Sequence, residues 1–178
     1  TIKSGAIFEL YFFQSIGCMK TVTESFDYKV YASMDELSLA DKELMSKAIE
    51  QLDKAYAPYS NFHVGAAARL IDNDIFIGSN QENASYPLCM CGERVALYSA
   101  GATKPNVAVE SLAITIKNQN MTIDKPVSPC GACRQVISEY EFRHKHAIRI
   151  LLKSDSPEVY ELKSVADILP LGFNGTFL

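Results

Sequence analysis

Apolar residues recur at helical spacing in the stretch that begins at Met34. The positions that share one face are Leu44, Met45, Ala48, Ile49, Leu52, Ala55 and Tyr56. Spacing of three and four residues is typical of an amphipathic helix that packs on a core. Ser38, followed three residues later by Asp41, predicts a capped start for this helix, and Pro58 predicts its end.

A β-hairpin is predicted after this helix. Residues 62–71 and 75–79 have the composition of strands, and the polar run 72–74 between them predicts the turn. Gly65 and the three alanines at 66–68 leave little side-chain volume on the first strand. We therefore expect a helix to pack closely against this hairpin.

The rest of the chain alternates between helical and extended patterns. It predicts a helix over 91–100 that stops at Gly101, a strand over 111–117, a helix over 130–140, strands over 146–152 and 159–162, and a short helix opened by Ser164. This alternation predicts an α/β fold, a three-layer α/β/α sandwich with a mixed sheet of about five strands. Both cysteine-containing segments then begin a helix, so the two N-termini are expected to face one point.

Length and charge favour a small-molecule enzyme over a nucleic-acid or membrane protein. The chain has 178 residues, of which 48 % are hydrophobic, and a net charge of −4, so we expect one domain over residues 19–178. Charged residues are mixed in sign, without the long basic run of a general nucleic-acid binder. No apolar run approaches the roughly 18 residues that a membrane span requires.

Cysteine usage and the first residues bear on the compartment. Five cysteines are an odd number, which disfavours a disulfide framework and predicts a reducing, cytoplasmic compartment.

The apolar cluster at 7–13 is interrupted by Glu9 and follows no basic cluster, so we reject a signal peptide. Residues 10–15 resemble an imperfect protease-cleavage linker, and we interpret residues 1–18 as an added leader, with a natural extension as the alternative.

Two cysteine motifs carry the candidate chemistry. Cys91 precedes Glu93 by two residues, and Cys130 and Cys133 follow in a Pro-Cys-x-x-Cys segment. Three thiolates bind one Zn²⁺ per subunit and leave its fourth position free, and zinc lowers the pKa of a bound water toward neutrality. A carboxylate that is not a ligand carries protons between that water and a nucleobase, and we assign this catalytic role to Glu93.

Three thiolates also create an electrostatic problem. Their combined charge exceeds that of a divalent ion and would weaken its Lewis acidity. Two helix N-termini place partial positive charge near the sulfurs, and Arg94 adds a full positive charge beside the ligands. We hypothesise that Arg94 offsets the third thiolate.

Each assignment has a plain structural alternative. Cys89 can join the other three cysteines as a fourth thiolate in a closed structural zinc site, or be a small buried residue. Glu93 can be a first-turn glutamate that only favours the helix dipole, and Arg94 an ordinary surface arginine. The spacing of Glu93 from the cysteines favours the catalytic interpretation.

Four motifs in one order resemble the homotetrameric zinc-dependent cytidine deaminases. The resemblance runs from about Leu37 to the C-terminus. Its motifs are Tyr59-Ser60-Asn61-Phe62-His63-Val64-Gly65-Ala66-Ala67, Asn80-Gln81-Glu82-Asn83-Ala84-Ser85-Tyr86-Pro87, Cys91-Gly92-Glu93-Arg94 and Pro129-Cys130-Gly131-Ala132-Cys133-Arg134-Gln135. Gly92 departs from the alanine usual in this family, and residues 1–36 have no counterpart.

The resemblance implies further substrate-binding residues. It implies that Asn80 and Glu82 hold the ribose 3′-hydroxyl, with a capped loop end as the alternative. It implies that Phe62 lines the pyrimidine pocket, that the Gly92 backbone touches the base, and that Tyr86 acts across a subunit interface. Phe173 resembles an aromatic that reaches a neighbouring subunit's pocket, although packing in its own core is the alternative.

The resemblance implies a pyrimidine-salvage hydrolase that converts cytidine and deoxycytidine to uridine and deoxyuridine with release of ammonia. Its expected partners are a small nucleoside and three further copies of itself. An aminonucleoside-antibiotic deaminase and a non-catalytic zinc-stabilised binding domain are the alternatives. An enzyme that edits polynucleotides is disfavoured, since that class usually has His where Cys91 stands.

Overall fold

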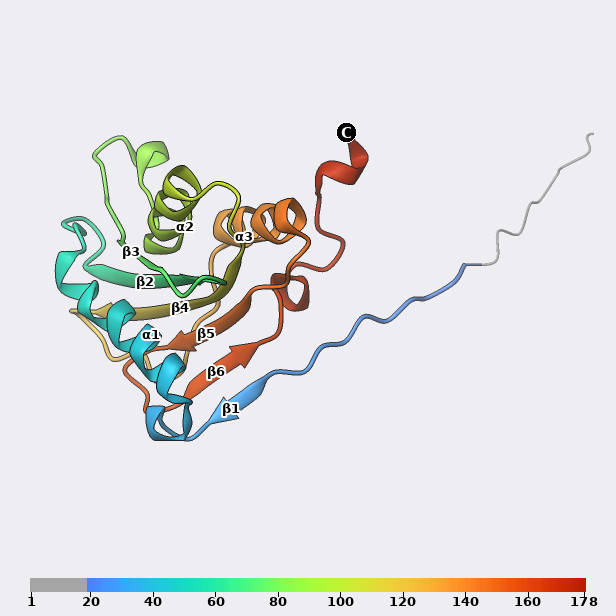
Figure 1. The fold of residues 1–178 in the computed structure, drawn as a ribbon. Helices are drawn as coiled ribbons and strands as arrows, with labels where there is room; N and C mark the ends of the chain where they lie inside the picture. Colours follow the sequence, from blue (N-terminus) through green and yellow to red (C-terminus); the bar gives the residue numbers. More distant parts are fainter. Residues whose placement is uncertain (1–18) are drawn as a thin grey trace, which may run out of the picture.

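Six strands form one mixed sheet in the order β1-β6-β5-β4-β2-β3 (Figure 1). The computed structural model describes residues 19–178, and its strands are β1 (Lys29–Tyr31), β2 (Phe62–Leu70), β3 (Ile75–Ser79), β4 (Val109–Asn118), β5 (Arg149–Lys153) and β6 (Val159–Leu162). β4 and β5 pair in parallel, and the other neighbours pair antiparallel. The β2–β3 hairpin is therefore confirmed.

Helices cover both faces of the sheet, as Figure 1 shows. α1 (Leu39–Glu50) lies on one face, and α2 (Gly92–Thr103) and α3 (Gly131–His144) lie on the other. The predicted α/β/α sandwich with a mixed sheet is confirmed. β1, which pairs with β6 at the edge, brings the sheet to six strands rather than about five.

β2 shows how small residues bring the layers together. Successive side chains of β2 point to opposite faces of the sheet and so belong to two different apolar clusters. Ala66 and Ala68 lie in the cluster under α2 and α3, and Ala67 lies in the cluster under α1. A Cβ atom at Gly65 would lie 2.1 Å from the carbonyl oxygen of Ala48 on α1. The close packing predicted from residues 65–68 is therefore confirmed.

Several helix ends differ from the sequence prediction. Gly101 was expected to stop α2 but lies inside it, since the helix continues to Thr103. A Cβ at this position would lie 2.3 Å from the Tyr140 hydroxyl of α3, which accounts for the glycine. Tyr140 donates a hydrogen bond to the carbonyl of Leu97 at 2.6 Å, which ties the two helices together. Gly101 thus serves helix packing rather than termination. α1 begins after the predicted Ser38 cap but ends at Glu50, well before Pro58.

A polar network joins β1 to the sheet. The buried carboxylate of Glu161 accepts hydrogen bonds from Lys29 Nζ and Tyr31 Oη, both at 2.8 Å, and lies 3.4 Å from Arg149 Nη1. Arg149 also pairs with buried Asp41 of α1 at 2.6 Å. Burial alone would raise the pKa of Glu161, but the hydrogen bonds from Lys29 and Tyr31 outweigh it and lower that pKa.

No helix in residues 19–178 is long and apolar enough to cross a membrane. The interpretation of residues 1–18 as an added leader lies outside the described residues. The assignment of residues 19–178 to one domain stays a prediction.

Candidate metal centre and catalytic pocket

α2 and α3 begin side by side at the candidate site. Cys91 is the N-cap of α2 and Cys130 is the N-cap of α3, and both have extended backbone. An isolated bridge between Gln81 and Met90 closes the loop that follows β3 and returns the chain to the start of α2. The two helix N-termini therefore direct backbone N–H groups and partial positive charge toward the cysteines.

The structure brings the three predicted cysteines together. The Sγ atoms of Cys91, Cys130 and Cys133 all lie within 4.8 Å of one another, and those of Cys130 and Cys133 are 3.5 Å apart. Cys89 is not in this group, and its Sγ instead accepts a hydrogen bond from the backbone N–H of Asn83 at 3.2 Å. Within residues 19–178 the cluster has three cysteine ligands and no fourth protein ligand, which disfavours the closed structural site.

The chemistry of this donor set fits Zn²⁺. A hydrogen bond from the Cys133 thiol and the nearby Arg94 guanidinium lower the pKa of Cys91 to about 5, so a thiolate forms readily there. Three soft sulfur donors at this spacing suit zinc with one position open to another ligand.

Arg94 lies where the sequence predicted a counter-charge. Its Nη2 is 3.9 Å from Cys91 Sγ and donates a hydrogen bond to the Cys89 carbonyl at 3.2 Å. Its Nε is buried and has no hydrogen-bond partner among the described residues. The guanidinium therefore uses only some of its N–H donors to stay next to the cysteine cluster.

Glu93 is a buried carboxylate without a full set of partners. Its side chain is 4 % exposed, and Oε2 has no hydrogen-bond partner in the described part of the chain. Burial raises the pKa of Glu93 to about 7, and the negative charge of Cys91 adds to the effect. A carboxyl group in this state can both accept and donate a proton near neutral pH.

A cavity of about 400 Å³ opens onto Glu93 and the cysteines. Its lining residues are Phe62, Val64, Cys91, Glu93, Ile114, Ile116, Val127, Ser128, Pro129, Cys130 and Arg134. The walls from β2 and β4 are apolar, and the polar groups gather at the end formed by α2 and α3. Predicted Phe62 therefore shares one cavity with Glu93, Cys91 and Cys130.

Glu82 and Tyr86 lie in a second cavity, which is about 250 Å³ in volume. The Glu82 carboxylate accepts hydrogen bonds from the backbone N–H of Tyr59 at 2.9 Å and from the Ser60 hydroxyl. Tyr86 is 68 % exposed, and its ring centre is 5.9 Å from that of Tyr59.

The buried amide of Asn80 is already engaged with β2. It accepts a hydrogen bond from Val64 N–H and donates one to the Phe62 carbonyl, both at 2.8 Å. Asn80 therefore fixes the strand that carries Phe62. Its amide group retains one N–H and one lone pair for a ligand.

Gly92 and Phe173 lie in very different surroundings. Gly92 is buried, and a Cβ there would lie 2.8 Å from the Val64 carbonyl, so alanine would require a shift of the backbone. Phe173 is 56 % exposed in the C-terminal segment, where its carbonyl accepts a hydrogen bond from Gln135 Nε2 at 2.8 Å. It does not line the cavity that contains Glu93.

Sequence reasoning missed part of the cavity wall. Ile114 and Ile116 could have been found from the alternation of β4, because residues two apart on a strand share one face. Ser128 and Arg134 also line the cavity, and Arg134 directly follows Cys133 in the second cysteine motif. Nothing in the sequence indicates that its side chain turns back over the helix start.

Residues 39–148 match the protein family described as the cytidine and deoxycytidylate deaminase zinc-binding region. A cytidine deaminase from Halalkalibacterium halodurans is 38 % identical over 132 residues, which cover 73 % of this chain and 91 % of that protein. A cytidine deaminase from Sporosarcina psychrophila is 35 % identical over 133 residues, with 75 % and 90 % covered.

Solved structures show the same likeness. The crystal structure of cytidine deaminase from Burkholderia pseudomallei superposes with a TM-score of 0.64 at 40 % identity, over 74 % of this chain and 97 % of that one. Cytidine deaminase from Mycobacterium tuberculosis superposes with a TM-score of 0.58 at 27 % identity, over 76 % and 98 %.

Proposed function

This chain belongs to the family of cytidine and deoxycytidylate deaminases with a zinc-binding region, and on that premise we propose that it hydrolyses cytidine and deoxycytidine to uridine and deoxyuridine with release of ammonia. Zinc is the cofactor of this family region. The observation that carries the proposal is the position of Glu93, which lines the same cavity as Cys91 and Cys130 and whose buried Oε2 has no hydrogen-bond partner in the described residues. A role in pyrimidine salvage in the cytoplasm is part of the same proposal.

Each residue has a distinct task in the proposed reaction. Cys91, Cys130 and Cys133 would hold the zinc ion, which would supply the Lewis acidity that makes water nucleophilic near neutral pH. Glu93 takes a proton from the attacking water and gives one to the ring N3 of the base. The hydroxyl that has added to C4 then gives its proton to Glu93, which passes it to the departing amino group; the C4–N bond breaks as the C4 carbonyl forms, so that water and cytidine yield uridine and ammonia.

The cavity walls support a base-binding role. Phe62 and the apolar residues of β2 and β4 give the cavity apolar walls, which suit the faces of a planar ring, and Glu93 beside them is only 4 % exposed. The Gly92 backbone lies at the start of α2, next to Cys91, and we propose that it contacts the base. Arg94 is proposed to offset the excess negative charge of the thiolates.

Ribose recognition is proposed for Asn80 and Glu82. Glu82 lines the second cavity, together with Tyr86. The Asn80 amide retains one N–H and one lone pair beyond its two hydrogen bonds to β2. We expect Glu82→Gln to lower kcat/KM for cytidine much more than for 3′-deoxycytidine, which lacks the hydroxyl. Equal losses on both substrates would contradict the assignment.

A homotetramer is proposed because two implied binding residues lie away from the metal centre. Tyr86 and Phe173 are both largely exposed within one subunit, so a neighbouring subunit is needed to bring them to a site. Light scattering of the purified protein tests this proposal, and a monomer with full activity would refute it.

The deaminase proposal is tested by the loss of cytidine absorbance on addition of the zinc-loaded protein. A panel with deoxycytidine and an aminonucleoside antibiotic defines the substrate, and Glu139→Gln on the exposed side of α3 is the matched control for Glu93→Gln. We expect full turnover in the parent and the control, and turnover at least about 10²-fold lower in the Glu93 variant, with the same zinc content in all three. Bound zinc without turnover on any substrate would instead indicate a zinc-stabilised binding domain.

A further inference from the structure

Arg134 uses all three guanidinium nitrogens to join separate parts of the chain. Nε donates to the Pro129 carbonyl at 2.7 Å, Nη2 donates to the Ser128 hydroxyl at 2.7 Å, and Nη1 donates to the Ile168 carbonyl at 2.9 Å. Ser128 and Pro129 are the two residues before Cys130, and both line the cavity that contains Glu93. Ile168 lies 34 residues after Arg134, at the end of a short 3-10 helix, η4 (Val165–Ile168).

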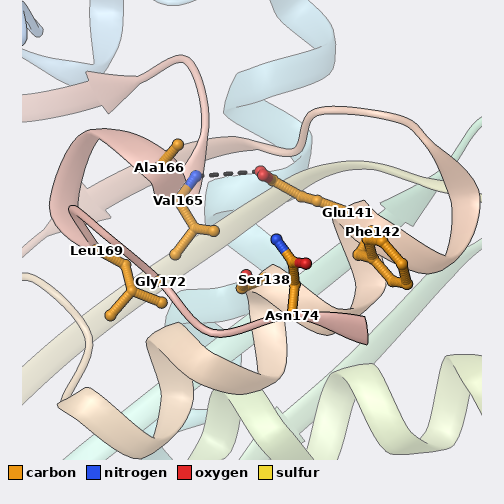
Figure 2. Close-up of a pocket in the computed structure, with 8 residues that line it drawn as sticks. All are labelled: Ser138, Glu141, Phe142, Val165, Ala166, Leu169, Gly172 and Asn174. Carbon is orange, nitrogen blue, oxygen red and sulfur yellow. Dashed lines mark hydrogen bonds between the residues drawn. The ribbon is translucent and has the colours of Figure 1, made fainter. Parts of the chain in front are cut away.

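The Ile168 end of this connection is itself fixed to α3. Glu141, one side chain in the cavity shown in Figure 2, accepts hydrogen bonds from the Val165 backbone N–H at 3.0 Å and the Ser164 hydroxyl at 2.7 Å. A capping box between Ser164 and Asp167 closes the start of η4. Since η4 is held independently, the Ile168 carbonyl is a fixed point against which Arg134 holds the segment before Cys130.

Helix stability does not account for an arginine at this position. Arg134 lies in the first turn of α3, where a positive side chain faces the positive end of the helix dipole. The side chain of Cys130, the N-cap residue, makes no capping hydrogen bond. The chain segment that leads into α3 must therefore be held by other contacts. The three hydrogen bonds of Arg134 provide it.

We propose that Arg134 is a positioning residue for the metal centre, which holds the Ser128–Pro129 segment against η4 and thereby fixes the Sγ of Cys130 relative to Cys133. Its effect on turnover rests on the proposed function, whereas its effect on metal retention does not. Exposed Cys130 is the ligand with least burial, while Cys133 is fully buried on the helix. Cys130 is therefore the ligand whose position depends most on the chain that precedes it.

Lysine cannot replace this arginine. The guanidinium offers donors in several fixed in-plane directions, whereas an ammonium is a single point of charge. One ammonium cannot reach Ser128, Pro129 and Ile168 with the same geometry. Arg134→Lys therefore keeps the charge and breaks the three-way connection, which separates positioning from electrostatics.

The test is the rate of zinc release from the full-length, zinc-loaded protein to an excess of a chromogenic chelator. Arg134→Lys is compared with Arg143→Lys, whose parent arginine lies at the other end of α3 and donates to the Pro105 carbonyl. We expect release to be about 10–100-fold faster in the Arg134 variant, as is typical when a residue that supports a ligand is lost. The Arg143 variant should release zinc at the parental rate even where its Tm falls.

Equal release rates in the parent and both variants would overturn the proposal, whatever the Tm values. If Arg134→Lys does not fold, Ser128→Ala, which removes one acceptor, decides: faster zinc release than the parent supports the proposal and an unchanged rate overturns it. kcat and KM for cytidine are measured on the same samples. A parent that binds zinc but does not deaminate any nucleoside would refute the proposed function and leave the zinc-release comparison intact.

Discussion

Two glutamates in this chain are buried to the same degree and have opposite surroundings. Glu93 on α2 and Glu161 on β6 are each 4 % exposed. Glu161 has Lys29, Tyr31 and Arg149 around it, and its pKa is lowered. Glu93 has an oxygen without a hydrogen-bond partner among residues 19–178, and burial raises its pKa to about 7.

The difference separates stability from chemistry. A buried carboxylate with several donors is held in its charged form and fixes neighbouring elements to one another. A buried carboxylate without a full set of donors has no such structural use, and its readiness to exchange a proton suits catalysis. Asp41, which pairs with Arg149, ties the Glu161 network to α1, whereas Glu93 faces the cavity between α2, α3 and the sheet.

The largest expected effect is that of Glu93→Gln. We expect turnover of cytidine to fall by at least about 10²–10⁴-fold, which is the usual contribution of a general acid–base group. The free energy of unfolding should stay the same or rise, because a neutral amide is less costly to bury than an incompletely paired carboxylate. Urea unfolding and steady-state kinetics on the same sample measure both. A clear loss of stability would mean that Glu93 resembles Glu161 after all.

The next effect is that of Arg94→Gln, which leaves Glu93 in place and removes the charge beside Cys91. We expect kcat/KM or zinc affinity to fall by about 10–100-fold, since groups that support metal ligands contribute at this level. Lys104→Gln, which removes a cation that pairs with Asp72 and Asp74 at the opposite end of α2, is the control. Unchanged zinc content together with unchanged turnover would refute the role of Arg94.

A smaller and opposite effect is expected for Glu161→Gln. Turnover should be unchanged, while the free energy of unfolding falls by about 1–2 kcal/mol from the loss of charged hydrogen bonds. The loss is limited because Lys29 is exposed enough to be solvated and Arg149 keeps its pair with Asp41. Urea unfolding measures it. A fall in kcat/KM without a fall in stability would contradict the division between the two glutamates.

The sequence predicted the cysteine cluster more completely than it predicted the edge strand and the helix ends. The cluster of Cys91, Cys130 and Cys133 was predicted because a metal site imposes residue types and spacings that the local sequence retains, whereas the catalytic role of Glu93 stays a proposal. β1 was missed because a strand of three residues is defined by its pairing with β6 rather than by its own pattern. The helix-packing role of Gly101 escaped prediction for a related reason, since it depends on Tyr140 of another helix.

Polar contacts between residues far apart in the chain also could not be predicted from the sequence. The partners of Glu161 come from positions 12 to 132 residues away, and the bond from Arg134 to Ile168 spans 34 residues. Residue types alone do not indicate which charges meet after folding. For this reason the two glutamates could not be told apart except through the cysteines next to Glu93.

The smallest effect is the pH dependence of stability that Glu161 contributes. Its pKa in the folded protein is lowered from an ordinary value of 4.5, so its contribution is present above that value and is lost as the pH falls through the folded pKa. The difference in unfolding free energy between the parent and Glu161→Gln should therefore be constant from pH 8 to about 5 and shrink toward zero below pH 4. Urea unfolding of both proteins across this range measures the difference. Should the difference instead persist unchanged at the lowest pH, the charge of Glu161 does not hold β1 and Arg149 to β6, and the replacement of an acceptor oxygen by an amide nitrogen is the cause.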